Sequence, residues 1–109
     1  MQWLLRWFQQ LFGIIPKHRL FRCEEVPESL DLYTLYVVGS GGCYWLAVMV
    51  CPCGCGDLIQ LSLASNGHPR WVVDEGVRRA ASLHPSIHRT AGCRSHFFLK
   101  QGKVIWCRD

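Results

Sequence analysis

The sequence CPCGCG at residues 51–56 places the strongest constraint on how this chain can fold. Its three cysteines are separated only by proline and glycine, and residues two apart on an extended chain rarely offer the Cβ geometry of a disulfide. A structural zinc site takes four ligands, usually deprotonated cysteine or neutral histidine. The loop therefore predicts a metal site that needs at least one further ligand from elsewhere in the chain.

The best source of that further ligand is the sequence GCRSH at residues 92–96. Cys93 and His96 are close enough in sequence for both side chains to reach one ion from a tight turn. Metal bonds between two clusters about forty residues apart would close a long loop and stabilise a small domain. More candidate ligands are present than the four places of a zinc ion, so we expect one to be left over: Cys51, Cys53, Cys55, Cys93 and His96.

Length and composition predict one compact domain in a reducing cytoplasm. A chain of 109 residues, 50% hydrophobic and 18% charged, fits a single globular core rather than a disordered chain. The cysteine count of 7 is odd, which argues against a paired disulfide framework and favours metal binding or catalysis. The net charge of +4 is well short of the basic clustering of nucleic-acid-binding domains, so no nucleic-acid partner is expected. No stretch approaches the roughly 18 uninterrupted apolar residues that span a bilayer.

The N-terminal segment carries a helical pattern. Trp3, Trp7 and Leu11 fall at i, i+4 and i+8, which predicts an amphipathic helix within residues 1–16. This helix could cover a face of the domain or dock a partner protein through its aromatic side chains. Contact with a membrane surface is less expected, because such helices carry more basic residues on their polar face. Residues 17–109 form the predicted zinc-binding β domain.

After the N-terminal segment, the pattern is that of a β protein. Apolar runs at 35–38 and 44–50 flank the sequence GSGG and predict a hairpin that leads into the cysteine loop. Runs at 97–99 and 104–106 flank KQG and predict a second hairpin, in which Gly102 takes a positive φ. Short strands with frequent turns predict a mostly β fold: a small single-domain β sandwich or partly open barrel with a cysteine-rich zinc site.

The other cysteines and histidines have simpler interpretations. Three cysteines beside apolar neighbours are expected to be small buried hydrophobes: Cys23, Cys43 and Cys107. Three histidines in basic or turn-like surroundings are expected to be solvated: His18, His68 and His88. His84 is a weak candidate for a spare ligand, and residues 77–83, ambiguous between helix and strand, are expected to form a strand.

Three linked motifs resemble a known family. CPCGCG, SLHPSI at 82–87 and CRSHFFLKQGKVIW at 93–106 have the family's order and spacing, with a weaker match at ESLDLYTLYV, residues 28–37. The chain closely resembles small bacterial proteins of undefined function that are encoded beside ubiquitin-like conjugation genes. Those genes encode E1-like, E2-like and ubiquitin-like proteins. The resemblance implies a role in processing or removing a ubiquitin-like modifier, with the modifier and its E1/E2-like enzymes as partners.

The matched motifs permit an enzyme in one of three forms. With Cys93 and the loop cysteines on zinc, His96 could activate the hydroxyl of Ser86 or Ser95 for attack on a peptide carbonyl. With His96 on zinc, a released cysteine could be the nucleophile. The third form uses a zinc-bound water and one of three carboxylates as general base: Glu24, Glu25 or Asp57. We favour a peptidase with Ser86 and His96 as catalytic residues.

One departure from the family pattern and one alternative function bear on this choice. Family members commonly follow PSI with a Gly-Asn pair, where this chain has His88 and Arg89, so His88 becomes a possible replacement base. Alternatively, the zinc site is only a structural staple and Ser86 a turn residue. The protein would then be a non-catalytic module that binds the modifier or its E1/E2-like partners.

Overall fold

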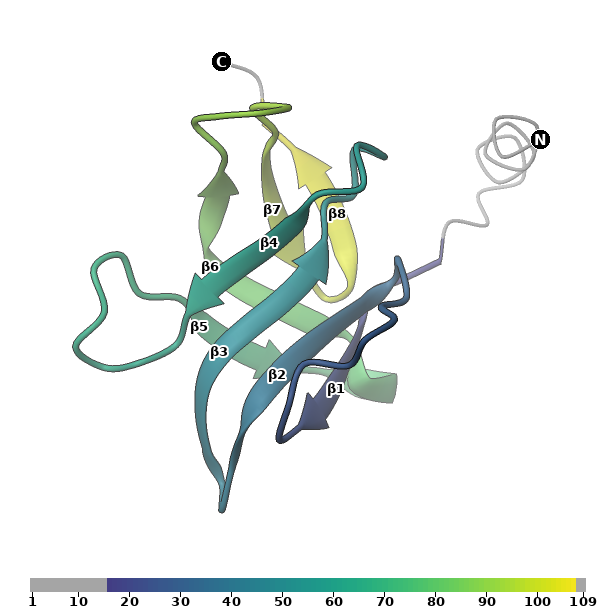
Figure 1. Cartoon of the computed structure of the whole chain (residues 1–109). Helices are drawn as coiled ribbons and strands as arrows, with labels where there is room; N and C mark the ends of the chain where they lie inside the picture. The colour runs from purple at the N-terminus through teal and green to yellow at the C-terminus, as the bar shows by residue number, and fades with distance from the viewer. Residues whose placement is uncertain (1–15, 108–109) are drawn as a thin grey trace.

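A computed structural model describes residues 16–107 of the chain as two four-stranded β-sheets (Figure 1). The first sheet contains, in spatial order, β1 (Arg19–Cys23), β2 (Thr34–Ser40), β3 (Cys43–Val50) and β4 (Leu58–Ser62). The second contains β5 (Val72–Glu75), β6 (Ala81–His88), β7 (His96–Lys100) and β8 (Lys103–Trp106). β1 and β2 are parallel, and the other neighbouring strands are antiparallel. A short 3-10 turn, η1 (Val77–Arg79), precedes β6.

The two sheets pack face to face around one apolar core. Alternate residues of each strand point inward, as the two-residue period of a strand requires. The core contains buried residues of both sheets: Leu20, Leu35, Val37, Ala47, Met49, Cys51, Ile59, Leu61, Ala81, Leu83, Ile87, Phe97 and Leu99. The fold is therefore a β sandwich in which the CPCGCG loop joins β3 and β4 of the first sheet, whereas Cys93 lies between β6 and β7 of the second.

A set of backbone hydrogen bonds joins the sheets at the start of β1. The His18 N–H donates to the Gly102 carbonyl at 2.8 Å, and the Ala81 N–H donates to the His18 carbonyl at 3.1 Å. Gly102 has a φ of +80°, and a Cβ there would lie 2.8 Å from the His18 oxygen. Only glycine satisfies both conditions, which confirms the predicted positive φ in the β7–β8 turn.

The predicted N-terminal helix requires a correction. Residues 16–107 contain two β-sheets and no α-helix, so the structure contradicts a fold described as a β domain preceded by an amphipathic helix. The segment on which that helix was predicted, residues 1–15, lies outside the described residues. Periodicity alone is a weak basis for a helix of this length, since isolated helices shorter than about 12 to 15 residues are marginal in water. Within residues 16–107, no helical segment has the length and hydrophobicity needed to cross a bilayer.

Several local predictions were also wrong. His18, expected to be solvated, is buried with 2% of its surface exposed, whereas Cys43, expected to be buried, is exposed. Ser86, considered as a turn residue after Pro85, lies inside β6. The segment at 77–83 is divided between η1 and the start of β6, because Arg78 and Arg79 adopt positive φ.

The hairpins predicted at GSGG and KQG are present as β2–β3 and β7–β8.

Candidate active site and metal centre

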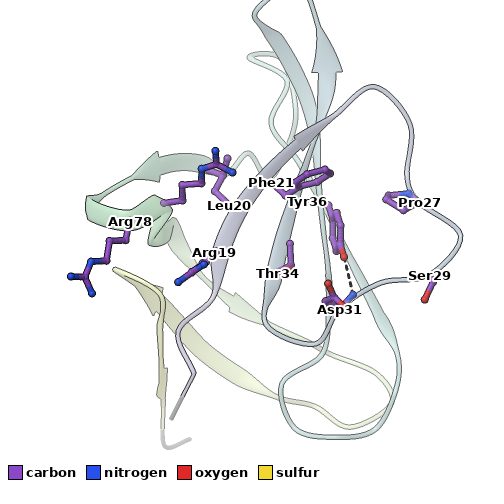
Figure 2. Close-up of a pocket in the computed structure, with 10 residues that line it drawn as sticks. Arg19, Leu20, Phe21, Pro27, Ser29, Asp31, Thr34, Tyr36 and Arg78 are labelled. Atoms are coloured by element: carbon purple, nitrogen blue, oxygen red, sulfur yellow. Dashed lines mark hydrogen bonds between the residues drawn. The ribbon is translucent and has the colours of Figure 1, made fainter. Parts of the chain in front are cut away.

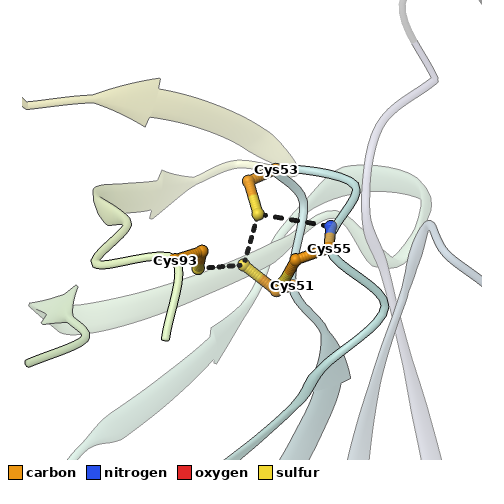
Figure 3. A group of neighbouring side chains, drawn as sticks. All are labelled: Cys51, Cys53, Cys55 and Cys93. Carbon is orange, nitrogen blue, oxygen red and sulfur yellow. Dashed lines mark hydrogen bonds between the residues drawn. The ribbon is translucent and has the colours of Figure 1, made fainter. Parts of the chain in front are cut away.

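Four cysteine side chains meet where the β3–β4 loop approaches the β6–β7 loop (Figure 3). Cys51, Cys53 and Cys55 come from the first loop and Cys93 from the second, and their sulfur atoms all lie within 4.8 Å of one another. The Cys51 sulfur is 3.4 Å from that of Cys53 and 3.6 Å from that of Cys93. Tetrahedral zinc with bonds of about 2.3 Å to sulfur places its ligands about 3.8 Å apart. The cluster therefore has the spacing of a four-cysteine metal site.

The CPCGCG loop is shaped to turn its sulfur atoms inward. The Cys51 N–H donates to the Asp57 carbonyl at 2.8 Å and closes the loop at its base. Gly54 and Gly56 take φ angles of 93° and 84°, which side chains rarely adopt, so glycine allows the backbone to curl between the cysteines. Cys51 is fully buried and Cys55 is exposed. The cluster thus lies at the surface, with one cysteine anchored in the core.

Two further side chains support the cluster. The hydroxyl of Ser95, a buried residue, lies 3.1 Å from the Cys93 sulfur and 3.6 Å from the Cys51 sulfur. The Arg89 guanidinium donates to the Cys93 sulfur at 3.1 Å and to Asp57 Oδ2 at 3.2 Å. Since Asp57 ends one loop and Arg89 begins the other, this ion pair joins the two loops beside the cluster.

The surroundings of the four thiols drive their pKa values apart. A hydrogen bond from Ser95 is the largest influence on Cys93 and lowers the pKa of its thiol to about 6. Burial raises the pKa of the Cys51 thiol. The Asp57 backbone lowers the pKa of Cys55, but the Cys53 thiol, desolvation and the other cysteines outweigh it and raise the value to about 12. Four thiolates this close repel one another, and a bound cation removes that repulsion.

Ser86 of β6 and His96 of β7 form a second candidate site, a pair of side chains on neighbouring strands. Ser86 Oγ lies 3.2 Å from His96 Nε2, and both side chains are half-buried. With the ring proton on Nδ1, Nε2 accepts the hydroxyl proton of Ser86. A hydroxyl beside an imidazole is the usual pairing of a nucleophile with its general base.

An irregularity in β6 contributes to the position of Ser86. Leu83 pairs with Leu99 and Ile87 with Phe97, so β6 takes four residues to match a two-residue step of β7. Bulges of this kind redirect side chains and are common beside active sites. The Trp71 indole N–H also donates to the Ser86 carbonyl at 3.4 Å. The backbone at Ser86 is therefore held by a residue of the segment before β5.

The predicted site residues fall into separate groups. Within residues 16–107, the side chains close enough to share one ion are the four cysteines, while His96 faces Ser86. Ser95 contacts the cysteine sulfurs, and Asp57 pairs with Arg89. The remaining carboxylates proposed as bases, Glu24 and Glu25, are exposed in the segment after β1. His84 is exposed on β6, where it pairs with Val72 of β5.

Trp71 and Arg89 contact the site without having been predicted to do so. The tryptophan follows a turn sequence, and nothing in its neighbourhood indicates a contact with a residue 15 positions later. Arg89 carried one signal, since it is the second residue after the SLHPSI motif, where the sequence departs from the Gly-Asn pair expected from the resemblance.

A basic cavity lies apart from both groups, on the outer side of β1 and β2 (Figure 2). Its volume is about 640 Å³, and its lining includes Arg19, Arg78 and Arg79 together with Phe21 and Tyr36. It shares no lining residue with the cysteine cluster or with the Ser86–His96 pair.

Comparison with known proteins identifies a matching family. The sequence model of a family described as "Bacterial ubiquitination-like system serine protease (BubE)" matches residues 22–107. The match includes the four clustered cysteines, Ser86 and His96, and it confirms the resemblance predicted from the three motifs. No curated protein and no solved structure matches the chain.

Proposed function

The chain belongs to the BubE family of bacterial ubiquitination-like system serine proteases, and we propose that it is a peptidase with Ser86 as nucleophile and His96 as general base. The observation that supports this assignment is the 3.2 Å contact between Ser86 Oγ and His96 Nε2. The family description requires a serine nucleophile. Ser86 has an imidazole within reach, whereas the Ser95 hydroxyl is buried against the cysteine sulfurs.

The proposed reaction is acyl transfer in two steps. Ser86 Oγ attacks the carbonyl carbon of the scissile peptide while His96 Nε2 takes the hydroxyl proton. The protonated imidazole then donates this proton to the leaving amine, which leaves the substrate acyl group esterified to Ser86. Water, deprotonated by His96, hydrolyses the ester and restores the hydroxyl.

The metal is proposed to be zinc, held by Cys51, Cys53, Cys55 and Cys93. Four sulfur ligands complete a tetrahedral site and leave no position for a reacting water, which is the pattern of structural rather than catalytic zinc. His96 is then the candidate ligand that is left over. Bound zinc would offset the repulsion between the thiolates and tie together the loops that precede β4 and β7. It would thereby support the strand that carries His96.

The proposed substrate is the C-terminal tail of a ubiquitin-like modifier, either in its precursor or in a conjugate. A pathway that attaches such a modifier needs an enzyme to mature or remove it, and a serine protease named for the pathway fits that need. E1-like and E2-like enzymes of the same system are the further proposed partners. The cytoplasm, where these partners would act, is the proposed location.

A cleavage assay tests this function with matched serine variants. The substrate is the ubiquitin-like precursor of the same system, fused at its tail to a reporter protein. We expect Ser86→Ala and His96→Ala to lower the cleavage rate by roughly 10³-fold or more while one metal ion per chain is retained. Ser95→Ala should cleave at close to the wild-type rate, yet bind metal roughly 10-fold to 100-fold more weakly, because it loses its contacts with the cysteine sulfurs.

Two results would contradict the proposed function. If Ser86→Ala cleaves as fast as the wild type, Ser86 is not the nucleophile. If the wild-type protein binds the fusion tightly without cleaving it, the non-catalytic binding module is the correct interpretation.

A further inference from the structure

His88 and His96 face each other across the β6–β7 pair. They are direct partners in the antiparallel register. Their imidazole rings are stacked, with centroids 4.3 Å apart and planes inclined by 14°. Side chains directly opposite on one face of a sheet are its main cross-strand contacts. The flat face of the proposed general base is therefore covered by a second imidazole.

The contacts that His96 makes with Ser86 and with His88 use different parts of its ring. The buried residue between Ser86 and His88, Ile87, points into the core, so both of its neighbours point away from the core. A ring nitrogen makes its hydrogen bond in the plane of the imidazole, whereas stacking acts perpendicular to that plane. The Nε2 contact with Ser86 and the stack on His88 can therefore form together.

The stack restricts the motion that would break the contact with Ser86. Rotation of the His96 ring about its Cβ–Cγ bond tilts the ring plane and moves Nε2 away from Ser86 Oγ. A ring packed 4.3 Å away with nearly parallel planes opposes this tilt. His88 itself is exposed on the outer face of β6, so substitution there leaves the core packing intact.

We propose that His88 is a positioning residue that holds the His96 imidazole in the plane required to take the proton of Ser86. The proposal rests on the proposed function of the Ser86–His96 pair. His88 acts through His96, so its loss lowers kcat and leaves KM for the modifier fusion unchanged. Since small misplacements of a catalytic group cost up to about 100-fold, we expect a loss of roughly 10-fold.

A fluorophosphonate reporter measures this effect without a known substrate. In the labelling step, Ser86 Oγ forms a bond to phosphorus, the P–F bond breaks, fluoride leaves and His96 takes the hydroxyl proton. We expect His88→Ala and His88→Leu to slow labelling roughly 10-fold, while His88→Phe, which retains a flat ring, stays within about 2-fold of the wild type. His68→Ala, in an exposed loop, is the matched histidine control and should label at the wild-type rate.

A double substitution separates positioning from a general structural effect. In a His96→Ala background, His88→Ala should cause no further loss, because the residue through which His88 acts is absent. Metal content and the thermal midpoint, measured on every variant, show whether the chain is folded.

Failure of this proposal is distinguishable from failure of the proposed function. If the wild type is labelled at Ser86 and His88→Ala reacts equally fast, the positioning role is overturned and the protease assignment stands. The role is also overturned if His88→Phe is as slow as His88→Ala, since stacking is then not the cause. A wild-type chain that neither reacts with the reporter nor cleaves the fusion overturns both.

Discussion

His18 is buried although Lys17 and Arg19 flank it in the sequence. Its ring packs edge-on against Tyr33, with centroids 5.6 Å apart. Burial is the largest influence on this histidine and lowers the pKa of its imidazole below the ordinary value of 6.5. The charged form is therefore disfavoured in the folded chain and not in the unfolded one.

This lowered pKa makes the free energy of unfolding depend on pH. Below pH 6.5 the unfolded chain takes up a proton that the folded chain resists, so the unfolded state binds more protons and stability falls as pH falls. We expect urea unfolding to show lower stability at pH 5.5 than at pH 7.5, and His18→Leu to lose part of that difference. Equal pH dependence in the wild type and in His18→Leu would show that His18 does not cause it.

Cys93 provides a chemical test of the cysteine cluster. In the metal-free protein, its lowered pKa of about 6 keeps the thiol largely ionised at pH 7, whereas burial raises the pKa of Cys51. Because the thiolate is the reactive form, we expect iodoacetamide to modify Cys93 before Cys51 and Cys55, whose pKa values are raised. Zinc should protect all four, and peptide mass spectrometry measures the order. Cys51 or Cys55 reacting first, or no protection by zinc, would contradict this description of the cluster.

The candidate site could be predicted from the sequence only as a set of residue types. The spacing of the cysteines indicated a metal site, and the motifs indicated Ser86 and His96. The choice among five candidate ligands depends on which loops the strand pairing brings together. That pairing places His96 of β7 opposite His88 of β6. It turns the His96 side chain toward Ser86 rather than toward the cysteines. No local sequence signal contains this information.

At the scale of elements, the β2–β3 hairpin depends on glycine for two different reasons. A Cβ at Gly39 would overlap the Cys43 carbonyl oxygen and lie 2.6 Å from Tyr44 Cα, both of them backbone atoms. A Cβ at Gly42 would meet nothing within 4 Å, but the φ there is +79°. The first position is limited by space and the second by backbone conformation.

These two glycines predict effects of different size. Gly42→Ala should lower the free energy of unfolding by about 1 kcal/mol, the cost of a left-handed conformation for a residue with a side chain. Gly39→Ala should lower it by roughly 3 kcal/mol, since the strands must separate to admit the methyl group. Urea unfolding of both variants measures the difference. A larger loss for Gly42→Ala than for Gly39→Ala would contradict the register of this hairpin.

The hairpins could be predicted because their turn chemistry is local. GSGG and KQG supply glycine at positions of positive φ, which is a short-range signal. The parallel pairing of β1 with β2 has no such signal, since parallel strands require a long connection. The 3-10 turn η1 was missed because Arg78 and Arg79 adopt φ angles of 56° and 62°, which the sequence pattern associates with glycine.

At the scale of the whole molecule, the cysteine cluster connects the two sheets. Three of its cysteines follow β3 of the first sheet, and Cys93 precedes β7 of the second. A metal ion bound there would hold the sandwich together at its surface, since binding energy of this kind contributes directly to folding.

Removal of the metal should therefore lower both stability and cleavage. We expect a chelator, or Cys93→Ser, to lower the thermal midpoint by on the order of 10 °C and to slow cleavage by loosening the segment before His96. Cys43→Ser is the matched control, because Cys43 is exposed on β3 and outside the cluster. Equal thermal midpoints for Cys93→Ser and Cys43→Ser would show that the cluster does not join the sheets.

Mapping of a covalent fluorophosphonate adduct is the most direct test of Ser86 as the nucleophile. The wild-type protein is treated with the reporter and digested, and the modified residue is identified by mass spectrometry. We predict one adduct, on Ser86, that is absent from His96→Ala although that variant retains its metal. An adduct on Ser95, or cleavage of the modifier fusion that persists in Ser86→Ala, would contradict the assignment.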